Sequence, residues 1–422
     1  MQKWKFIIVL FAFNLLVINA IGQKRFPKPE FETEYMQPQM HSPLPRANIL
    51  EYLDILILVG SLSLISWVIV KKRSRKAVFW ITVFSVIYFG FYRQGCICSV
   101  GSIQNVSFAL FNPGSEIPFS ALVFFFIPII YTLLFGRTFC AGICPLGALQ
   151  ELFVFKPINL EAWLEKILGI LPFIYLGLAV LYSATGTDFI ICRYDPFVGF
   201  FRFNASFMML IVGGIFLLLG VFIARPYCRF LCPYGALLNL FSRFSRKHLT
   251  ITPNECIQCR LCEDSCPVGS IENPNLLKER ENPKKSTKRY ISYLIILPVL
   301  IIIGGLSISS FHENLAMANA KVRLAKEIMN KTNFGLIDDE ALEISGFKTS
   351  GQSVSELFEE ASNVVNSFYY GSWFLGAYLG LVFGLTLINL NVFRYSPDYT
   401  INKATCHSCA RCVDYCPIKK SV

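Results

Sequence analysis

Two runs of cysteine with identical spacing carry the clearest chemistry in this sequence. Both have the form C-x2-C-x2-C-x3-C-P, and their cysteines are Cys256, Cys259, Cys262, Cys266, Cys406, Cys409, Cys412 and Cys416. Three closely spaced thiolates can bind three irons of one [4Fe–4S] cluster, and the fourth cysteine of such a run usually binds the cluster of the partner run. We therefore predict two [4Fe–4S] clusters with exchanged ligands: Cys416 completes the first set of three and Cys266 the second.

Zinc and structural disulfides are the alternatives for these eight cysteines. Zinc sites more often have two cysteine pairs separated by a long gap. Disulfides persist in oxidising compartments, whereas the topology argued below places both runs on the reducing side of a membrane. The spacing therefore favours iron–sulfur clusters.

A second set of cysteines lies in an internal repeat. Residues Gly136–Phe153 recur 88 residues later as Ala224–Phe241, with nine of eighteen positions identical. Each copy contains a CxxxCP loop, and the four cysteines are Cys140, Cys144, Cys228 and Cys232. Four thiolates suit a further iron–sulfur cluster, although soft ligands also hold copper and buried thiols can be inert packing groups. The repeat thus predicts an additional redox or metal site, with inert packing as the alternative.

Cys96, Cys98 and Cys192 form the third set. Cys98 and Cys192 each precede an apolar stretch that leads to a CxxxCP loop, so they occupy comparable positions in the two copies. A disulfide between two of the three would be stable in an oxidising compartment. A redox or metal-binding role is the other interpretation of this set.

The composition indicates a membrane protein. Of 422 residues, 54% are hydrophobic and 16% are charged, whereas soluble domains are about a quarter charged. A bilayer-spanning helix needs ~20 mostly apolar residues. Seven uncharged stretches approach that length: 55–70, 77–92, 119–136, 167–184, 203–224, 291–308 and 370–393. In the last of these, Gly376, Gly380 and Gly384 share one helix face and predict a close contact with another helix.

The charges give these spans an orientation. The segments placed inside are 1–5, 71–76, 137–166, 225–290 and 394–422, and they carry 27 Lys and Arg against 12 in the outside segments. Cytoplasmic loops carry the excess of Lys and Arg, so both cysteine runs are predicted on the cytoplasmic side of the membrane. Because each basic cluster adjoins a span, the net charge of +11 indicates membrane orientation and not nucleic-acid binding.

The expected fold is an all-α polytopic membrane protein with two parallel-topology transmembrane repeats and a small cytoplasmic α+β two-cluster ferredoxin-like module. The repeats are parallel because each CxxxCP loop follows a span that runs inward. The N-terminal half divides into a signal peptide or N-terminal anchor (1–22), a periplasmic linker (23–50) and a transmembrane core (51–250) with repeats at about 77–160 and 167–247. The C-terminal half divides into a first ferredoxin half (251–283), a transmembrane helix (284–308), a periplasmic segment (309–369), a transmembrane helix (370–393) and a second ferredoxin half (394–422).

The sequence resembles the NosR/NirI family of membrane-bound polyferredoxins. The resemblance rests on the paired R-x-x-C-x3-C-P-x-G-A-L loops, on Tyr194-Asp195-Pro196-Phe197, on the two cysteine runs and on the stretch from His312 to Cys416. It begins at about residue 29, where Pro29-Glu30-Phe31-Glu32-x-x-Tyr35 is similar to the linker before the family's first span. Members usually carry a large periplasmic domain with covalent FMN there. About thirty residues occupy that place here, so no covalent FMN is expected.

The resemblance implies an iron–sulfur electron-transfer component, not a stand-alone enzyme. It would pass electrons across the inner membrane to support the activity or maturation of periplasmic nitrous oxide reductase in denitrification. The implied partners are membrane lipid, a cytoplasmic or quinol electron donor, and a periplasmic flavoprotein, cytochrome or nitrous oxide reductase as acceptor. Two alternatives remain: a maturation or regulatory polyferredoxin for copper-site assembly or metal reduction, and a NapH-like quinol-linked redox subunit.

Overall fold

The computed structural model describes residues 47–95, 98–155, 157–158, 160–251, 256–274, 283–334, 347, 353–391 and 398–418. The chain divides into two compact units, Met1–Ala47 and Asn48–Val422, and every element below belongs to the second. The predicted N-terminal segment 1–22 and nearly all of the predicted linker 23–50 lie outside the described residues.

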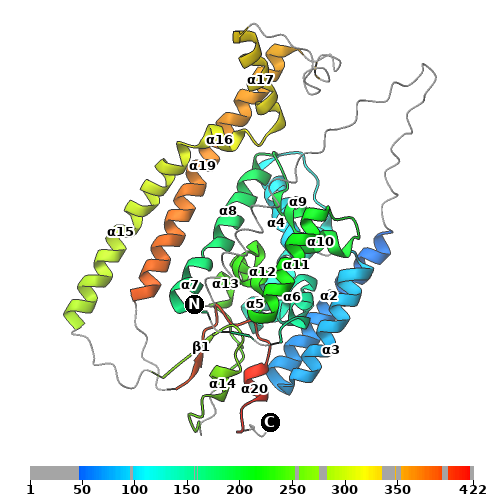
Figure 1. Ribbon diagram of the computed structural model, residues 1–422, viewed down its shortest axis with the longest axis vertical. Helices are drawn as coiled ribbons and strands as arrows, with labels where there is room; N and C mark the ends of the chain where they lie inside the picture. The colour runs from blue at the N-terminus through cyan, green and yellow to red at the C-terminus, as the bar shows by residue number, and fades with distance from the viewer. Residues whose placement is uncertain are drawn as a thin grey trace, which may run out of the picture. The chain divides into compact units, whose positions relative to one another are not determined.

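Helices account for almost all of the regular structure (Figure 1). Through the first CxxxCP loop they are α2 (Asn48–Trp67), the π-helix η1 (Val68–Lys72), α3 (Arg75–Ser85), the π-helix η2 (Val86–Tyr92), α4 (Ser99–Phe111), α5 (Phe119–Phe135), the π-helix η3 (Phe139–Ile143) and α6 (Pro145–Leu152). Through the second loop they are α7 (Ala162–Leu168), α8 (Leu171–Ala184), α9 (Ile190–Tyr194), α10 (Pro196–Phe201), α11 (Phe207–Phe222), α12 (Pro226–Phe230) and α13 (Pro233–Ser242).

The C-terminal part combines long helices with very short elements. Its elements are α14 (Leu261–Asp264), β1 (Ile271–Glu272), α15 (Pro283–Ser309), α16 (His312–Ala316), α17 (Ala320–Phe334), α19 (Val354–Asn391), β2 (Thr400–Ile401) and α20 (Arg411–Asp414). The two strands pair antiparallel, with Ile271 opposite Ile401. This pairing joins the two predicted ferredoxin halves, which stand on either side of α15 and α19 in the sequence.

Local sequence signals explain where several helices begin. Pro145 and Pro233 each occupy the first position of the helix that follows a CxxxCP loop, where the missing N–H and the fixed φ of proline suit the helix. Ser206 caps α11, because its hydroxyl accepts the N–H of Met209. The side chain of Asp195 caps α10 in the same way. Such caps satisfy N–H groups that have no partner within the helix.

Among the residues that the structure describes, four helices are long and apolar enough to cross a membrane: Ile49–Lys72, Trp163–Ala184, Thr287–Ser309 and Val354–Leu390. They coincide with four of the seven predicted spans, so the prediction of a helical membrane protein is confirmed at this level. The predicted spans 119–136 and 203–224 form shorter apolar helices, α5 and α11. The predicted span 77–92 is helical, as α3 continued by η2.

Helices α15 and α19 lie side by side along their length (Figure 1). A Cβ atom added at Gly376 would collide with the backbone of Gly304, and one added at Gly380 would collide with the backbone of Leu300. The predicted contact through the glycine face of 370–393 is therefore present. Small residues bring two helix backbones close enough for van der Waals packing where lipid removes most of the hydrophobic driving force.

We expect Gly376→Ala and Gly380→Ala to separate these two helices and to destabilise the protein by about 1–3 kcal/mol, the usual cost of overpacking. The measurement is the thermal unfolding midpoint of the protein in detergent. Gly60→Ala in α2 is the matched control, because a Cβ atom there meets nothing within 4 Å. Equal midpoints for all three variants would contradict the proposed role of the glycine face.

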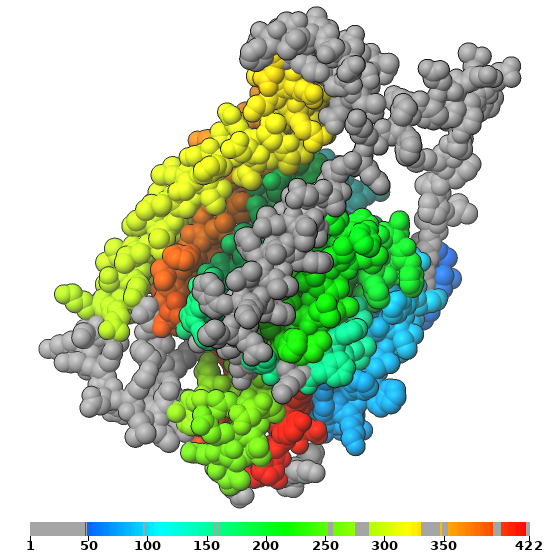
Figure 2. Space-filling model, in the orientation of Figure 1, coloured from blue at the N-terminus to red at the C-terminus, as the bar shows by residue number. Residues whose placement is uncertain are grey.

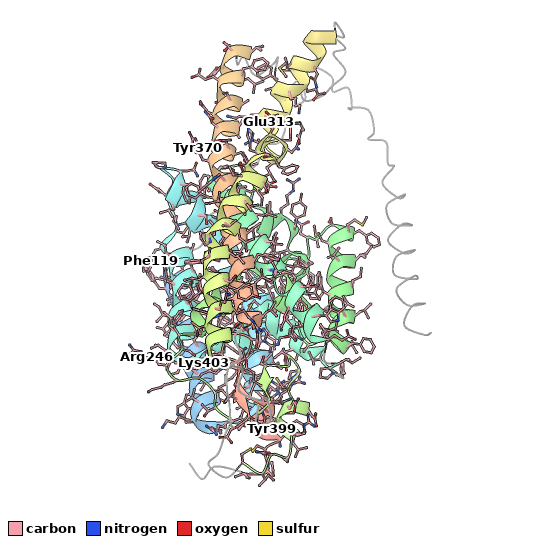
Figure 3. All side chains as sticks on the ribbon, turned by 90° about the vertical axis from the view of Figure 1, so that its left-hand side faces the viewer. Phe119, Arg246, Glu313, Tyr370, Tyr399 and Lys403 are labelled. Carbon is pink, nitrogen blue, oxygen red and sulfur yellow. The ribbon has the colours of Figure 1, made fainter. Side chains whose placement is uncertain are left out.

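The two ferredoxin halves meet at one end of this unit. In Figure 2 the surface of the first half lies against that of residues near 411–418. Figure 3 shows Tyr399, Lys403 and Arg246 toward this end, whereas Glu313 and Tyr370 lie toward the opposite end. The helices α15 and α19 thus return the chain to the end from which it left.

Candidate iron–sulfur centre

Four cysteines from both runs surround one cavity at the ferredoxin end. The first run contributes Cys256, Cys259 and Cys262, and the second contributes Cys416. Apolar and aromatic side chains, among them that of Tyr399, complete the wall together with the charged residue Arg260. The structure therefore brings together the same four thiols that the spacing predicted for one cluster.

A second cavity holds the remaining four cysteines of the runs. Cys406, Cys409 and Cys412 line it together with Cys266 of the first run. Each cavity thus takes three cysteines from one run and the fourth from the other. The exchange arises because the cysteine before each Pro lies beyond the short helix, α14 or α20, and so on the side of the neighbouring run.

The two runs share an unusual backbone conformation. Gln258 and Arg260 flank Cys259, the second cysteine of the first run, and have positive φ angles of 52° and 63°. Ser408 and Ala410 stand at the equivalent positions of the second run, with φ angles of 53° and 59°. Left-handed backbone is costly for residues other than glycine and persists where surrounding structure or function demands it. Its presence at the same two positions indicates that both loops are shaped around the same kind of group.

The donor set fits [4Fe–4S] clusters better than single metal ions. Among the described residues, no three His, Cys, Asp or Glu side chains are close enough together to hold one ion. A cubane cluster binds each thiolate at a different iron, so its four ligands stand farther apart than the ligands of a single ion. Backbone N–H groups also point at the sulfurs: that of Ser408 donates to Cys406 Sγ and that of Ser270 to Cys266 Sγ, both at 3.3 Å. Such N–H groups stabilise thiolate ligands and tune cluster potentials.

The two CxxxCP loops lie together beside the second cavity. Cys144 and Cys232 precede α6 and α13, and a Cβ atom added at Gly147 in the first copy would lie 3.5 Å from Cys228 Sγ in the second. The side-chain amide of Gln150 donates to Cys228 Sγ at 3.3 Å. The structure therefore gathers the four repeat cysteines from two segments that lie far apart in the sequence.

The glycines after the two CxxxCP loops have equivalent surroundings. A Cβ atom at Gly147 would lie 3.5 Å from the carbonyl oxygen of Cys140, and one at Gly235 would lie 3.1 Å from that of Cys228. Each helix therefore packs on the carbonyl of the first cysteine of its own loop. The approach is tight at Gly235 only, because 3.5 Å at Gly147 is an ordinary van der Waals distance.

A buried carboxylate links the CxxxCP loops to the second ferredoxin half. Glu151 is 5% exposed and forms ion pairs with Arg75, Arg225 and Arg411. Burial raises the pKa of Glu151, but the charges of the three arginines outweigh it and lower that pKa to about 2. Arg225 also donates to the carbonyl oxygen of Cys140. This network places the carboxylate of Glu151 and the three guanidinium groups beside the repeat cysteines. Burial strengthens the attraction between the carboxylate and the guanidinium groups.

Further contacts dock the second ferredoxin half against the core. Arg75 Nη1 donates to the carbonyl oxygen of Cys409 at 3.1 Å, and Arg137 Nη1 donates to that of Ala404 at 3.2 Å. Ser242 donates to the carbonyl oxygen of Lys403. The second cavity and the repeat cysteines are thus held next to each other by contacts from several core helices.

Sequence reasoning did not single out Gln150 and Glu151. The second copy has Leu238 and Asn239 at the corresponding positions. The available signal was a charged residue at the end of an otherwise uncharged helix, present in only one copy of the repeat. Its partners could not be inferred, because Arg411 lies 260 residues away in the sequence.

The third set of cysteines lies near the CxxxCP loops. Cys98 caps α4, and it shares a cavity with Cys144. Cys192 lies on α9 and is exposed. Cys96 lies outside the described residues. The segments expected as outer loops thus contain short helices that pack against the core, and α4 contacts α5, α8 and α13.

Comparison with protein families supports iron–sulfur chemistry in both cysteine-rich parts. A family described as a 4Fe-4S binding domain matches residues 117–170 and 205–252, which contain the two CxxxCP loops. A second family with the same description matches residues 249–272, which contain the first cysteine run. No solved structure matches the chain.

Comparison with individual proteins supports the family. The uncharacterized protein MJ0750 of Methanocaldococcus jannaschii is 31% identical over 43% of this chain and 77% of its own length. The protein NirI of Paracoccus denitrificans is 28% identical over 52% of this chain and 35% of its own length. The regulatory protein NosR of Stutzerimonas stutzeri is 27% identical over 47% of this chain and 30% of its own length. The chain therefore belongs to the NosR/NirI-like family of membrane polyferredoxins.

Proposed function

We propose that this protein carries electrons across the bacterial inner membrane through iron–sulfur centres. The observation that carries the proposal is the arrangement of three cysteine sites in one unit. Two cavities are each lined by four cysteines, and the four repeat cysteines lie in loops that contact the second ferredoxin half. Each of the first two cavities would hold one [4Fe–4S] cluster with exchanged fourth ligands. The cofactor supplies the one-electron chemistry, and the chain supplies ligands, orientation and electrostatics.

The CxxxCP cysteines would form a third redox centre. Four thiols from two symmetric loops suit a further iron–sulfur cluster, and the family match over both loops supports that cofactor. Arg225 and Arg137 lie beside these cysteines: Arg225 donates to Ala141 O at 2.9 Å and Arg137 Nη2 is 4.0 Å from Cys140 Sγ. A cluster bound by four thiolates is anionic, and two neighbouring guanidinium groups would stabilise it.

The ferredoxin halves would face the cytoplasm, because the segments that adjoin them carry the excess of Lys and Arg. A cytoplasmic or quinol donor would then reduce the first clusters. A periplasmic flavoprotein, cytochrome or nitrous oxide reductase would be the acceptor. The resemblance to the NosR/NirI family implies nitrous oxide reduction as the pathway served, and NosR and NirI are among the relatives of this chain.

Anaerobic purification followed by iron and sulfide analysis and EPR of the reduced protein tests the cofactor part. We expect about eight irons per chain from the two ferredoxin clusters and more from a third centre. Cys140→Ser combined with Cys228→Ser should remove the excess and leave the other iron in place. An iron content of zero in anaerobically prepared protein would refute the proposal.

A regulatory or maturation role is the second candidate, and the name of the relative NosR, a regulatory protein, favours it. The two roles differ in what happens to the copper enzyme when this protein is lost. For an electron conduit, the deletion strain should stop consuming nitrous oxide while its reductase keeps a full copper content. A reductase deficient in copper would instead favour the maturation role.

A further inference from the structure

Two sulfurs outside the three centres approach one point beside α4. A Cβ atom added at Gly101 would lie 3.2 Å from Cys192 Sγ and 3.8 Å from Cys98 Sγ. Any side chain at position 101 would therefore crowd the sulfur of Cys192. The absence of a side chain at Gly101 leaves the space in which these two sulfurs can meet.

Rigid elements hold both cysteines in place. Cys98 Sγ accepts the N–H of Gly101 at 3.3 Å, at the first turn of α4. Gln104, which is fully buried on α4, accepts the N–H groups of Ile191 and Cys192 at 3.1 and 3.2 Å. The side chain of Gln104 thus fastens α9 to α4 at the level of the two sulfurs.

These cysteines lie between the repeat cysteines and the surface. Cys98 lines one cavity with Cys144, the second cysteine of the first CxxxCP loop. Cys192 is exposed, whereas Cys144 is buried. The hydrocarbon core of a bilayer is about 30 Å thick, so clusters at one end of the protein need an intermediate site to serve a partner at the other. Cys98 and Cys192 continue the series of sulfurs away from the ferredoxin end.

We propose that Cys98 and Cys192 form a dithiol–disulfide redox site that exchanges electrons with the CxxxCP cysteines. This inference rests on the proposed function, because the electrons come from its iron–sulfur clusters. The proposed iron–sulfur centres would supply two electrons, one at a time. The two electrons enter the Sγ–Sγ bond, the bond breaks, and the two sulfurs take up two protons from water to become thiols. Oxidation by an outer disulfide of a partner protein reverses the step at the surface.

Thiol trapping on the full-length protein in nanodiscs tests this site. The background variant is Cys96→Ser, which leaves Cys98 and Cys192 as the remaining members of the third set. Protein oxidised with ferricyanide or reduced with dithionite is quenched in acid, denatured and alkylated, and the peptides are weighed. We expect neither cysteine to be alkylated after oxidation and both to be alkylated after reduction.

Two further variants locate the partner and the electron route. In Cys98→Ser on the same background, Cys192 should be alkylated in both redox states. In Cys140→Ser with Cys228→Ser, dithionite should no longer reduce the disulfide between Cys98 and Cys192. EPR should still show reduced ferredoxin clusters in this variant. Alkylation of Cys192 after oxidation of the background protein, its protection in Cys98→Ser, or release of the pair without the CxxxCP cysteines would each overturn the proposal. Iron analysis of the same samples reports separately on the proposed function.

Discussion

Serine in place of Cys259 is expected to remove one [4Fe–4S] cluster, and with it about four irons per chain, while the second cluster stays in place. A second substitution in this variant then shows whether the fourth ligand of the remaining cluster comes from the other run or from its own. With exchange, adding Cys266→Ser removes the remaining cluster, because Cys266 lines the cavity of Cys406, Cys409 and Cys412. Adding Cys416→Ser should have no further effect, because its cavity has already lost its cluster.

Iron analysis and EPR at low temperature measure this result in the single variant and the two double variants. Cys192→Ser is the matched control, since it removes a thiol that lines neither ferredoxin cavity. If Cys416→Ser, and not Cys266→Ser, removed the second cluster, each run would supply all four ligands of its own cluster. That outcome would overturn the arrangement proposed for this end of the molecule.

The grouping of the eight cysteines could be predicted because it depends on short-range spacing. Three residues of each set lie within seven positions of one another, and the run's geometry leaves its fourth cysteine for the neighbour. The return of both runs to one end followed from the count of long apolar stretches between them. The positions of four long apolar helices and the glycine contact of α15 with α19 could be predicted for the same reason, since each depends on a local pattern.

The features that could not be predicted depend on contacts between distant segments. The lengths of the apolar stretches predicted only that 93–118 and 185–202 are outer loops. In the structure these segments contain α4, α9 and α10, which pack against the core with the help of polar residues such as Gln104. The positive φ angles in the two runs could not be predicted from composition either. Gln258 and Ala410 are not residue types that favour the left-handed region. The role of Glu151 could not be predicted, because it depends on ion pairs with Arg225 and Arg411 that the sequence does not reveal.

Glu151→Gln is expected to destabilise the protein by about 3–5 kcal/mol, the usual cost of removing one partner from a buried ion pair. The side chains of Glu151 and Arg225 are each 2% exposed, so solvent cannot replace the lost charge. The thermal unfolding midpoint in detergent measures the effect. Glu116→Gln is the control, because Glu116 is exposed and its loss should change the midpoint little.

The same carboxylate should also hold the second ferredoxin half in place. Arg411 on α20 reaches Glu151 at 2.7 Å, so the loss of the charge loosens the segment that carries three ligands of the second cavity. We expect the EPR signal of that cluster to broaden or decline in Glu151→Gln while the signal of the first cluster persists. Combining Glu151→Gln with Arg411→Gln should cost less than the sum of the two single changes, because the double variant no longer buries that arginine's unpaired charge. Strict additivity, with both cluster signals unchanged, would reduce Glu151 to a residue that stabilises the core without positioning the second ferredoxin half.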